Sequence, residues 1–183
     1  MDDPEQSADP AEPRWRPGRD RVDAEILDPD RLLPDPALRW VRDHSAAAAR
    51  ELARRFAIAG EARVLLVDDA RMARVHEERS GIAGTTDVLT FDLAPDDGTL
   101  LDADVYVCVD EATRQAHEFG HPVEREVLLY TLHAMLHGIG HDDTDDTSYA
   151  EMHRVEDEVL TAIGVGATFD PPRDPANSPG VAR

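Results

Sequence analysis

The sequence predicts a single domain of the α+β class, α/β-like in element order, with a mixed β-sheet of about four strands flanked by helices. The chain has 183 residues, which suffices for one domain with a core and is short for two ordinary ones. β-rich runs alternate with helical segments, which favours parallel strand pairing. Two of the runs are joined by the turn-forming segment APDDG, which favours a hairpin. The pattern leaves the strand order open.

Prolines mark the limits of this domain. Seven of the 13 prolines lie within residues 1–36 and four within 171–183. Residues 1–12 carry five acids and no base, a composition that buries too little apolar surface to offset chain entropy. We therefore expect a disordered acidic, proline-rich tail at 1–19, a folded domain at 20–167 and a disordered proline-rich tail at 168–183.

The first half of the domain is predicted to contain two strands and two helices. Val22–Leu27 alternates as a strand does, and strong helix formers from about Ala37 to Ile58 predict a long helix that Gly60 closes. Arg63–Val67 (RVLLV) is typical of a buried strand. Asp68 or Asp69 can cap a second helix that runs to about Arg79.

The second half begins with neighbouring strands and continues with helices. The strands are predicted at Thr86–Leu93 and Ala103–Val109, on either side of APDDG. Three helices are predicted at Glu111–Phe119, at Pro122 to about Ile139, and at about Ser148 to Ile163. Pro122 suits the first position of its helix, and the regularly spaced leucines after it predict that this helix is largely buried.

Charge and composition exclude several classes of function. There are 39 acidic and 19 basic residues, and the net charge of −20 opposes nonspecific attraction to nucleic acid or anionic lipid. Any RNA partner must therefore meet a local basic patch, and no DNA partner is expected. All basic residues are arginine, which excludes Schiff-base chemistry and lysine-bearing phosphate loops. Seven arginines in the first half either form such a patch or a salt-bridged face: Arg50, Arg54, Arg55, Arg63, Arg71, Arg74 and Arg79.

The expected compartment is the cytoplasm. No apolar run approaches the roughly 18 residues of a membrane span, and the acidic, proline-rich N-terminus is unlike a secretory signal. The single cysteine, Cys108, cannot form an internal disulfide and is best interpreted as a small buried hydrophobe.

The stretch LHAMLHGIGHDD, Leu132 to Asp143, carries the chemistry. His133 and His137 are four residues apart and project from one face of a helix, as a bidentate metal clamp does. Gly138 and Gly140 permit the chain to turn back, which brings His141, Asp142 or Asp143 towards the same ion. Two histidines and a third ligand leave one position open for water, as in catalytic zinc sites, where the pKa of that water falls to about 7.

The alternative interpretation is purely structural. Two histidines on a core helix can simply be buried and hydrogen-bonded. The acidic run HDDTDD can likewise be a solvated loop that caps the following helix at Thr147 or Ser148.

These residues resemble the signature of the YbeY family of bacterial ribosomal RNA maturation factors, which are metal-dependent endoribonucleases. The signature is His-x3-His-x5-His within a segment like HGxLHLxGYDH, and it is matched by His133, Leu136, His137, Gly140 and Asp142, with Asp143 at the third histidine. Upstream, TDVLTF at Thr86–Phe91 resembles the family's TDVLSF strand, and LDADVYV at Leu101–Val107 resembles its LGDIVIS strand. The similarity spans about residues 20–165.

The resemblance implies a mixed sheet with the metal helix in a cleft. It also implies a single-strand-specific endoribonuclease in 3′ end maturation of small-subunit ribosomal RNA and in ribosome quality control. The implied partners are ribosomal RNA and the small ribosomal subunit, and the implied cofactor is one divalent ion, zinc. The family register makes Asp143 the third ligand beside His133 and His137, with His141 and Asp142 as alternatives; aspartate oxygen binds zinc well.

A second departure from the family lies upstream. The family's functional arginine aligns with Ser80, and Arg79 stands one position earlier, which turns its side chain by about 100° on a helix.

Two other functions compete with the endoribonuclease interpretation. Zinc peptidases carry a glutamate directly after the first histidine, where this chain has Ala134. A noncatalytic ribosome-associated interaction protein fits the acidic charge and the missing arginine.

Overall fold

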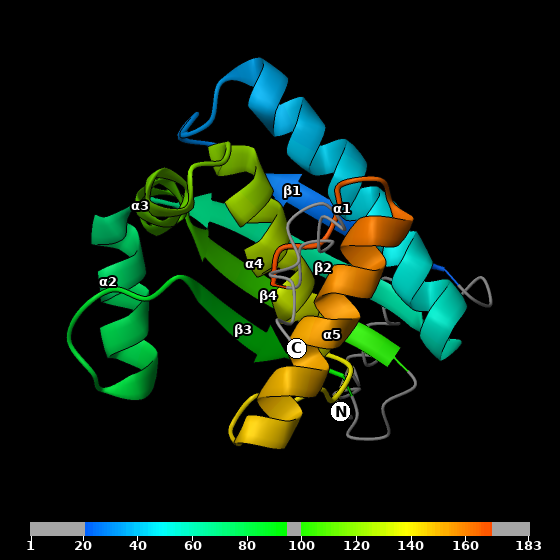
Figure 1. The fold of residues 1–183 in the computed structure, drawn as a ribbon. Helices are drawn as coiled ribbons and strands as arrows, with labels where there is room; N and C mark the ends of the chain where they lie inside the picture. Colours follow the sequence, from blue (N-terminus) through cyan, green and yellow to red (C-terminus); the bar gives the residue numbers. More distant parts are fainter. Residues whose placement is uncertain (1–20, 95–99, 170–183) are drawn as a thin grey trace, which may run out of the picture.

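The computed structural model describes residues 21–94 and 100–169, and it confirms the α+β fold with a mixed four-stranded sheet (Figure 1). The predicted tail at 1–19 and all but two residues of the predicted tail at 168–183 lie outside the described residues. The elements in chain order are β1 (Val22–Leu27), α1 (Asp35–Phe56), β2 (Ala59–Val67), α2 (Asp69–Ser80), β3 (Val88–Asp92), β4 (Leu100–Cys108), α3 (Val109–Phe119), α4 (Val123–His137) and α5 (Asp146–Ala162).

The sheet has the strand order β1-β2-β4-β3. β1, β2 and β4 are parallel, and β3 is antiparallel to β4, as the hairpin prediction required. β2 and β4 are longer than predicted because they pair over nine residues, from Ala59 opposite Leu100 to Val67 opposite Cys108. β1 and β3 are therefore the two edges of the sheet.

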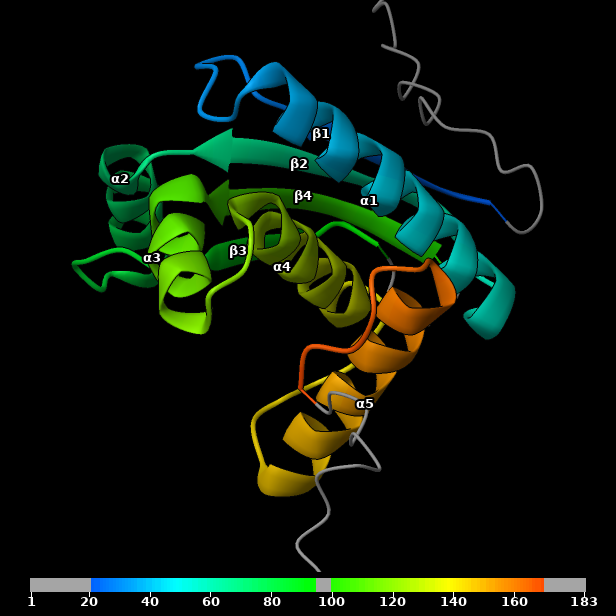
Figure 2. The same ribbon diagram turned by 45° about the horizontal axis from the view of Figure 1, so that its top comes forward.

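Helices cover the sheet unequally (Figure 2). α1 and α4 pack on one face, where the alternate residues of β4 (Leu101, Ala103, Val105 and Val107) join the main core. α2 packs on the other face, where Met72 forms a small cluster with Val67 and Cys108. Cys108 is fully buried, as the sequence predicted, and burial raises the pKa of its thiol to about 11.

The end of α1 differs from the prediction. Ala57, in the left-handed conformation at φ 52°, follows the helix directly, and Gly60 lies inside β2 instead of capping α1. Gly60 has φ 142°, and a Cβ atom there would lie 1.8 Å from the carbonyl oxygen of Leu101. The glycine is needed for the close approach of β2 to β4, so the sequence interpretation of Gly60 was wrong.

α4 positions the candidate site. Ten of its 15 residues are buried, so packing fixes its rotation on the sheet. It ends at His137 and is followed by the cap residue Gly138, where a Cβ atom would lie 2.6 Å from the Leu101 side chain. The following loop leads to α5, which Asp145 caps in a capping box with Ser148. The cap therefore lies two residues before Thr147 and three before Ser148, where we expected it.

Several of the first-half arginines form ion pairs. Arg54 and Arg55 bind Glu51, and Arg63 binds the carboxylates of Glu61, Asp102 and Asp104 across the sheet. These three arginines fit the salt-bridged alternative better than a basic patch.

Within the described residues, no helix combines the length and hydropathy that crossing a membrane requires.

Candidate metal centre

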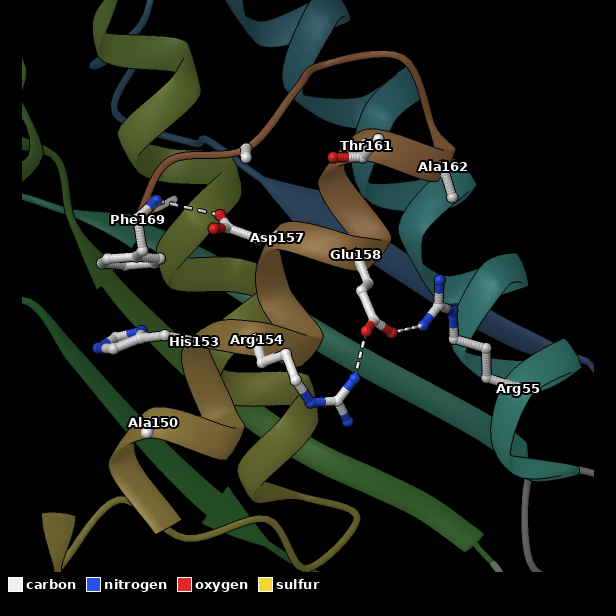
Figure 3. Close-up of a pocket in the computed structure, with 10 residues that line it drawn as sticks. Arg55, Ala150, His153, Arg154, Asp157, Glu158, Thr161, Ala162 and Phe169 are labelled. Atoms are coloured by element: carbon white, nitrogen blue, oxygen red, sulfur yellow. Dashed lines mark hydrogen bonds and ion pairs between the residues drawn. The ribbon is translucent and has the colours of Figure 1, made fainter. Parts of the chain in front are cut away.

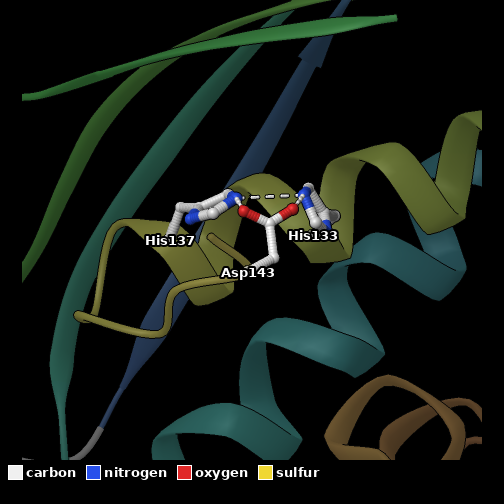
Figure 4. Close-up of side chains that lie close together, drawn as sticks. All are labelled: His133, His137 and Asp143. Carbon is white, nitrogen blue, oxygen red and sulfur yellow. Dashed lines mark hydrogen bonds and ion pairs between the residues drawn. The ribbon is translucent and has the colours of Figure 1, made fainter. Parts of the chain in front are cut away.

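His133, His137 and Asp143 lie together at the C-terminal end of α4 (Figure 4). The two Nε2 atoms are 3.0 Å apart. The carboxylate oxygens of Asp143 lie 3.5 Å from Nε2 of His133 and 3.7 Å from Nε2 of His137. Two atoms bound tetrahedrally at about 2.1 Å from one ion are about 3.4 Å apart, so the three donors have the spacing of a shared cation site.

The local sequence explains how Asp143 returns to the helix. The two histidines are one helical turn apart, and Gly140 adopts φ 91° in the loop that follows. The carbonyl oxygen of His141 then accepts a hydrogen bond from Nδ1 of His137 at 3.0 Å. The side chain of Asp142 accepts a hydrogen bond from the backbone N–H of Asp143 at 2.8 Å, which fixes the loop.

The tautomers of both histidines follow from these partners. Nδ1 of His133 faces a carboxylate oxygen of Glu156, and Nδ1 of His137 faces a carbonyl oxygen, and each of these partners is an acceptor. In the neutral form of each ring, Nδ1 therefore carries the proton, and the Nε2 lone pairs are then directed at each other and at the Asp143 carboxylate. A set of converging lone pairs is stabilised by a cation, so these residues fit a divalent ion.

Glu156 supports the site from α5. Its carboxylate is fully buried and uses both oxygens, one for Nδ1 of His133 at 2.8 Å and one for Nδ1 of His153 at 2.6 Å. Burial opposes protonation of His133, but the hydrogen bond and charge of Glu156 outweigh it and raise the pKa of His133. Carboxylates behind ligating histidines commonly fix ring orientation. Sequence reasoning missed both Glu156 and His153.

The other sequence candidates lie elsewhere. The ring of His141 packs edge-on against that of Phe56, with ring centres 5.2 Å apart, and burial lowers the pKa of His141. Ser80 donates its hydroxyl to the carbonyl of His76, and the guanidinium carbon of Arg79 lies 5.1 Å from the centre of the Phe91 ring. Among the described residues that line the cavities beside the histidines, neither Ser80 nor Arg79 occurs.

Two cavities flank the three side chains. One, of about 480 Å³, follows β3 and is lined by Asp87, Val88, Leu89, Thr90, Asp92, His133, His137 and Asp143. The other, of about 510 Å³, lies between α3, α4, α5 and the segment that follows α5, and His133, Asp143 and Asp87 also line it. The candidate ligands therefore stand between two open spaces.

A third cavity, of about 650 Å³, lies along α5 and contains none of the candidate ligands (Figure 3). Its walls carry the ion pairs of Glu158 with Arg55 and Arg154. Phe169 lies over His153 there, with ring centres 3.7 Å apart, and its backbone N–H donates to Asp157. Phe169 and Thr168 therefore contact α5, although the sequence placed them at the start of the tail.

Comparisons with known proteins point to one family. A family model described as Endoribonuclease YbeY matches residues 33–164. An Endoribonuclease YbeY from Micrococcus luteus is 36% identical over 112 residues, which cover 56% of this chain and 70% of the relative. The one from Moorella thermoacetica is 35% identical over 132 residues, covering 66% of this chain and 81% of the relative.

Structural comparison supports the same fold. A solution structure of a Thermotoga maritima protein covers 76% of this chain and 90% of its own, with a TM-score of 0.51 and 22% identity. The region that the family model matches contains the two histidines, Asp143 and both upstream strand motifs, as the sequence resemblance predicted. From this match, over most of the domain, we conclude that the chain belongs to the YbeY endoribonuclease family.

Proposed function

We propose that this protein is a single-strand-specific, metal-dependent endoribonuclease that acts in 3′ end maturation of small-subunit ribosomal RNA and in ribosome quality control. The observation that carries the proposal is the convergence of three ligand atoms at the end of α4 in a chain of this family. Its partners would be ribosomal RNA and the small ribosomal subunit, and its compartment the cytoplasm.

The proposed cofactor is one zinc ion per chain, with His133, His137 and Asp143 as ligands. Two imidazole nitrogens and one carboxylate oxygen suit zinc, and three protein ligands are typical of catalytic zinc. When bound, such an ion supplies an acidified water and neutralises charge that develops on a phosphoryl group.

The chain's own residues hold this arrangement in place. Glu156 and the carbonyl of His141 accept the Nδ1 protons of the two rings, which aims both Nε2 atoms at one point. Asp87, on the wall of both cavities, is held by hydrogen bonds to its Oδ1 from the Thr86 hydroxyl at 2.9 Å and the Val88 N–H at 2.8 Å. The acidic walls repel phosphate, and a bound cation would offset this repulsion at the scissile phosphate.

The direct test is cleavage of a single-stranded RNA with the sequence of a small-subunit ribosomal RNA 3′ end. Purified protein should cut it, chelation should stop the reaction, and zinc should restore it. His137→Ala should be inactive, whereas His117→Ala, at an exposed histidine of α3, should cleave normally. The same RNA paired to a complement, and a DNA of the same sequence, should remain intact.

Two results would favour the competing functions. Stoichiometric zinc with no cleavage of any RNA, together with ribosome binding that survives loss of both histidines, would favour a noncatalytic interaction protein. Cleavage of unfolded protein substrates would favour a peptidase. The position after His133 argues against the latter, because Ala134 is fully buried and offers no carboxylate base.

A further inference from the structure

Three exposed aromatic side chains converge on the 510 Å³ cavity beside the candidate ligands. Phe119 at the end of α3 is 67% exposed, Tyr149 in the first turns of α5 is 52% exposed, and Phe169 is 43% exposed. They belong to three separate segments of the chain. Among the described residues, Phe56 is the other aromatic side chain with this degree of exposure.

Aromatic surface left in water is unfavourable, and a concentration of it around one cavity marks a binding site. Leu129 and Tyr130 of α4 complete an apolar wall. Cavities of this size with aromatic walls are typical of sites for small molecules or groups.

The aromatic walls are fixed before any ligand binds. Phe169 stacks on His153, and Tyr149 meets the same ring edge-on at 4.1 Å. Arg125 donates hydrogen bonds to the carbonyl oxygens of Val165, Gly166 and Ala167, which ties the segment before Phe169 to α4. On the opposite side, Phe119 lies nearly parallel to His121, at an angle of 11°.

The charges at the cavity exclude a phosphate and permit a neutral base. Four acidic residues line it: Asp87, Glu126, Asp143 and Glu156. The basic groups are Arg125 and three histidines, each of which faces a carboxylate of Glu126 or Glu156. Glu126 is 3% exposed and lies 3.2 Å from Nε2 of His121. Carboxylates accept hydrogen bonds from the N–H groups on the edge of a nucleobase, whereas they repel its phosphate.

The position of the cavity determines which base of a bound RNA can enter it. His133 and Asp143 form part of its wall, so a phosphodiester at the candidate metal centre has its neighbouring base within reach of the cavity. We propose that this cavity is a nucleobase-binding subsite, which stacks the base next to the scissile phosphate of single-stranded RNA against Tyr149, Phe119 and Phe169. The inference rests on the proposed function, because it takes RNA as the ligand. Stacking on aromatic rings tolerates any base and requires an unpaired strand.

The test uses binding without cleavage. Full-length protein treated with chelator is titrated with a short single-stranded RNA that carries 2-aminopurine, whose fluorescence is quenched by stacking. Stacking contributes enough that Tyr149→Ala or Phe119→Ala should weaken binding about 5- to 150-fold and reduce the quench. Tyr149→Phe keeps the ring and should bind as the parent protein does. Leu27→Ala, at an exposed leucine on the opposite edge of the sheet, is the matched control.

A second measurement locates the base. In the metal-loaded protein, an abasic ribose beside the scissile phosphate should reduce cleavage of the RNA by a similar factor, and Tyr149→Ala should cause no further loss on that substrate. Metal-dependent cleavage that is equal for Tyr149→Ala, Phe119→Ala and the parent would overturn the subsite and leave the proposed function standing. If quenching requires the Tyr149 ring but the protein cleaves no RNA, the nucleobase-binding subsite stands and the proposed function is overturned.

Discussion

Nδ1 of His133 and Oε1 of Glu156 lie 2.8 Å apart, although 23 residues separate them in the chain. The contact joins the end of α4 to the middle of α5 and sets which nitrogen of His133 faces the other candidate ligands. Because Glu156 also accepts a hydrogen bond from His153, one buried carboxylate connects the proposed metal centre to the aromatic cavity.

Replacing this carboxylate should weaken metal binding without removing a ligand. In Glu156→Gln, the amide has one acceptor oxygen for two Nδ1 donors, so the orientation or tautomer of His133 is lost in part of the molecules. Zinc affinity should fall about 10- to 100-fold in a competition titration with a chromophoric chelator. Glu158→Gln, on the same helix but in surface ion pairs, should bind zinc as the parent does. Equal affinities for both variants would contradict the role of Glu156.

The third ligand can be identified by comparing two neighbours. Asp143→Ala should lower zinc affinity by orders of magnitude, because it removes the carboxylate whose two oxygens face the two Nε2 atoms. His141→Ala should have a modest effect, since its backbone carbonyl, which holds His137, is retained. Zinc content after dialysis and competition titration measure both. The opposite ranking would transfer the ligand role to His141.

Gly60 should tolerate no side chain. Gly60→Ala places a Cβ atom against the backbone of Leu101, so β2 and β4 must separate locally, and the thermal unfolding midpoint should fall by well over 5 °C. Gly120→Ala provides the control, because it too has a positive φ, of 72°, but open space around it. Its cost should be limited to about 1 kcal/mol of backbone strain. Similar midpoints for the two variants would argue against the close approach.

Acid should destabilise the protein partly through Glu51. Hydrogen bonds from Arg54 and Arg55 lower the pKa of Glu51 to about 2, below its value in the unfolded chain. Its contribution to stability is therefore present above about pH 4.3 and is lost as the pH falls towards 2. Urea unfolding at pH 7 and pH 3 should show a smaller loss of stability for Glu51→Gln than for the parent. An unchanged pH dependence in the variant would show that these ion pairs contribute nothing.

Local patterns predicted most of the elements but not their arrangement. β1 was predicted at its observed bounds because alternation within six residues specifies it. The strand order depends on pairing between distant segments, which no local pattern encodes. Gly60 was misread as a helix end because a glycine after a helix is common there, whereas its observed role depends on Leu101, far along the chain.

The pairing of His133 and His137 was predicted because it follows from the geometry of one helix. The turn after the helix left His141, Asp142 and Asp143 open, and only the family register favoured Asp143. Glu156 was missed because its partners are in another helix. A signal was present, however: Glu156 lies in the buried stripe of α5 that includes Met152, Val155, Val159 and Leu160. A charged residue within such a stripe requires a buried partner, and the histidines of α4 were candidates.

The dependence of His133 on α5 also sets an order of events during synthesis. Both histidines and Asp143 leave the ribosome before Glu156 does, since translation runs from the N-terminus. A nascent chain therefore holds all three proposed ligands while the carboxylate that orients one of them is still missing. The proposed zinc affinity, and with it the proposed cutting of RNA, would be acquired only when the last helix has been made and docked. Under the proposed function, an unfinished copy of this protein would thus be harmless to the RNA around it.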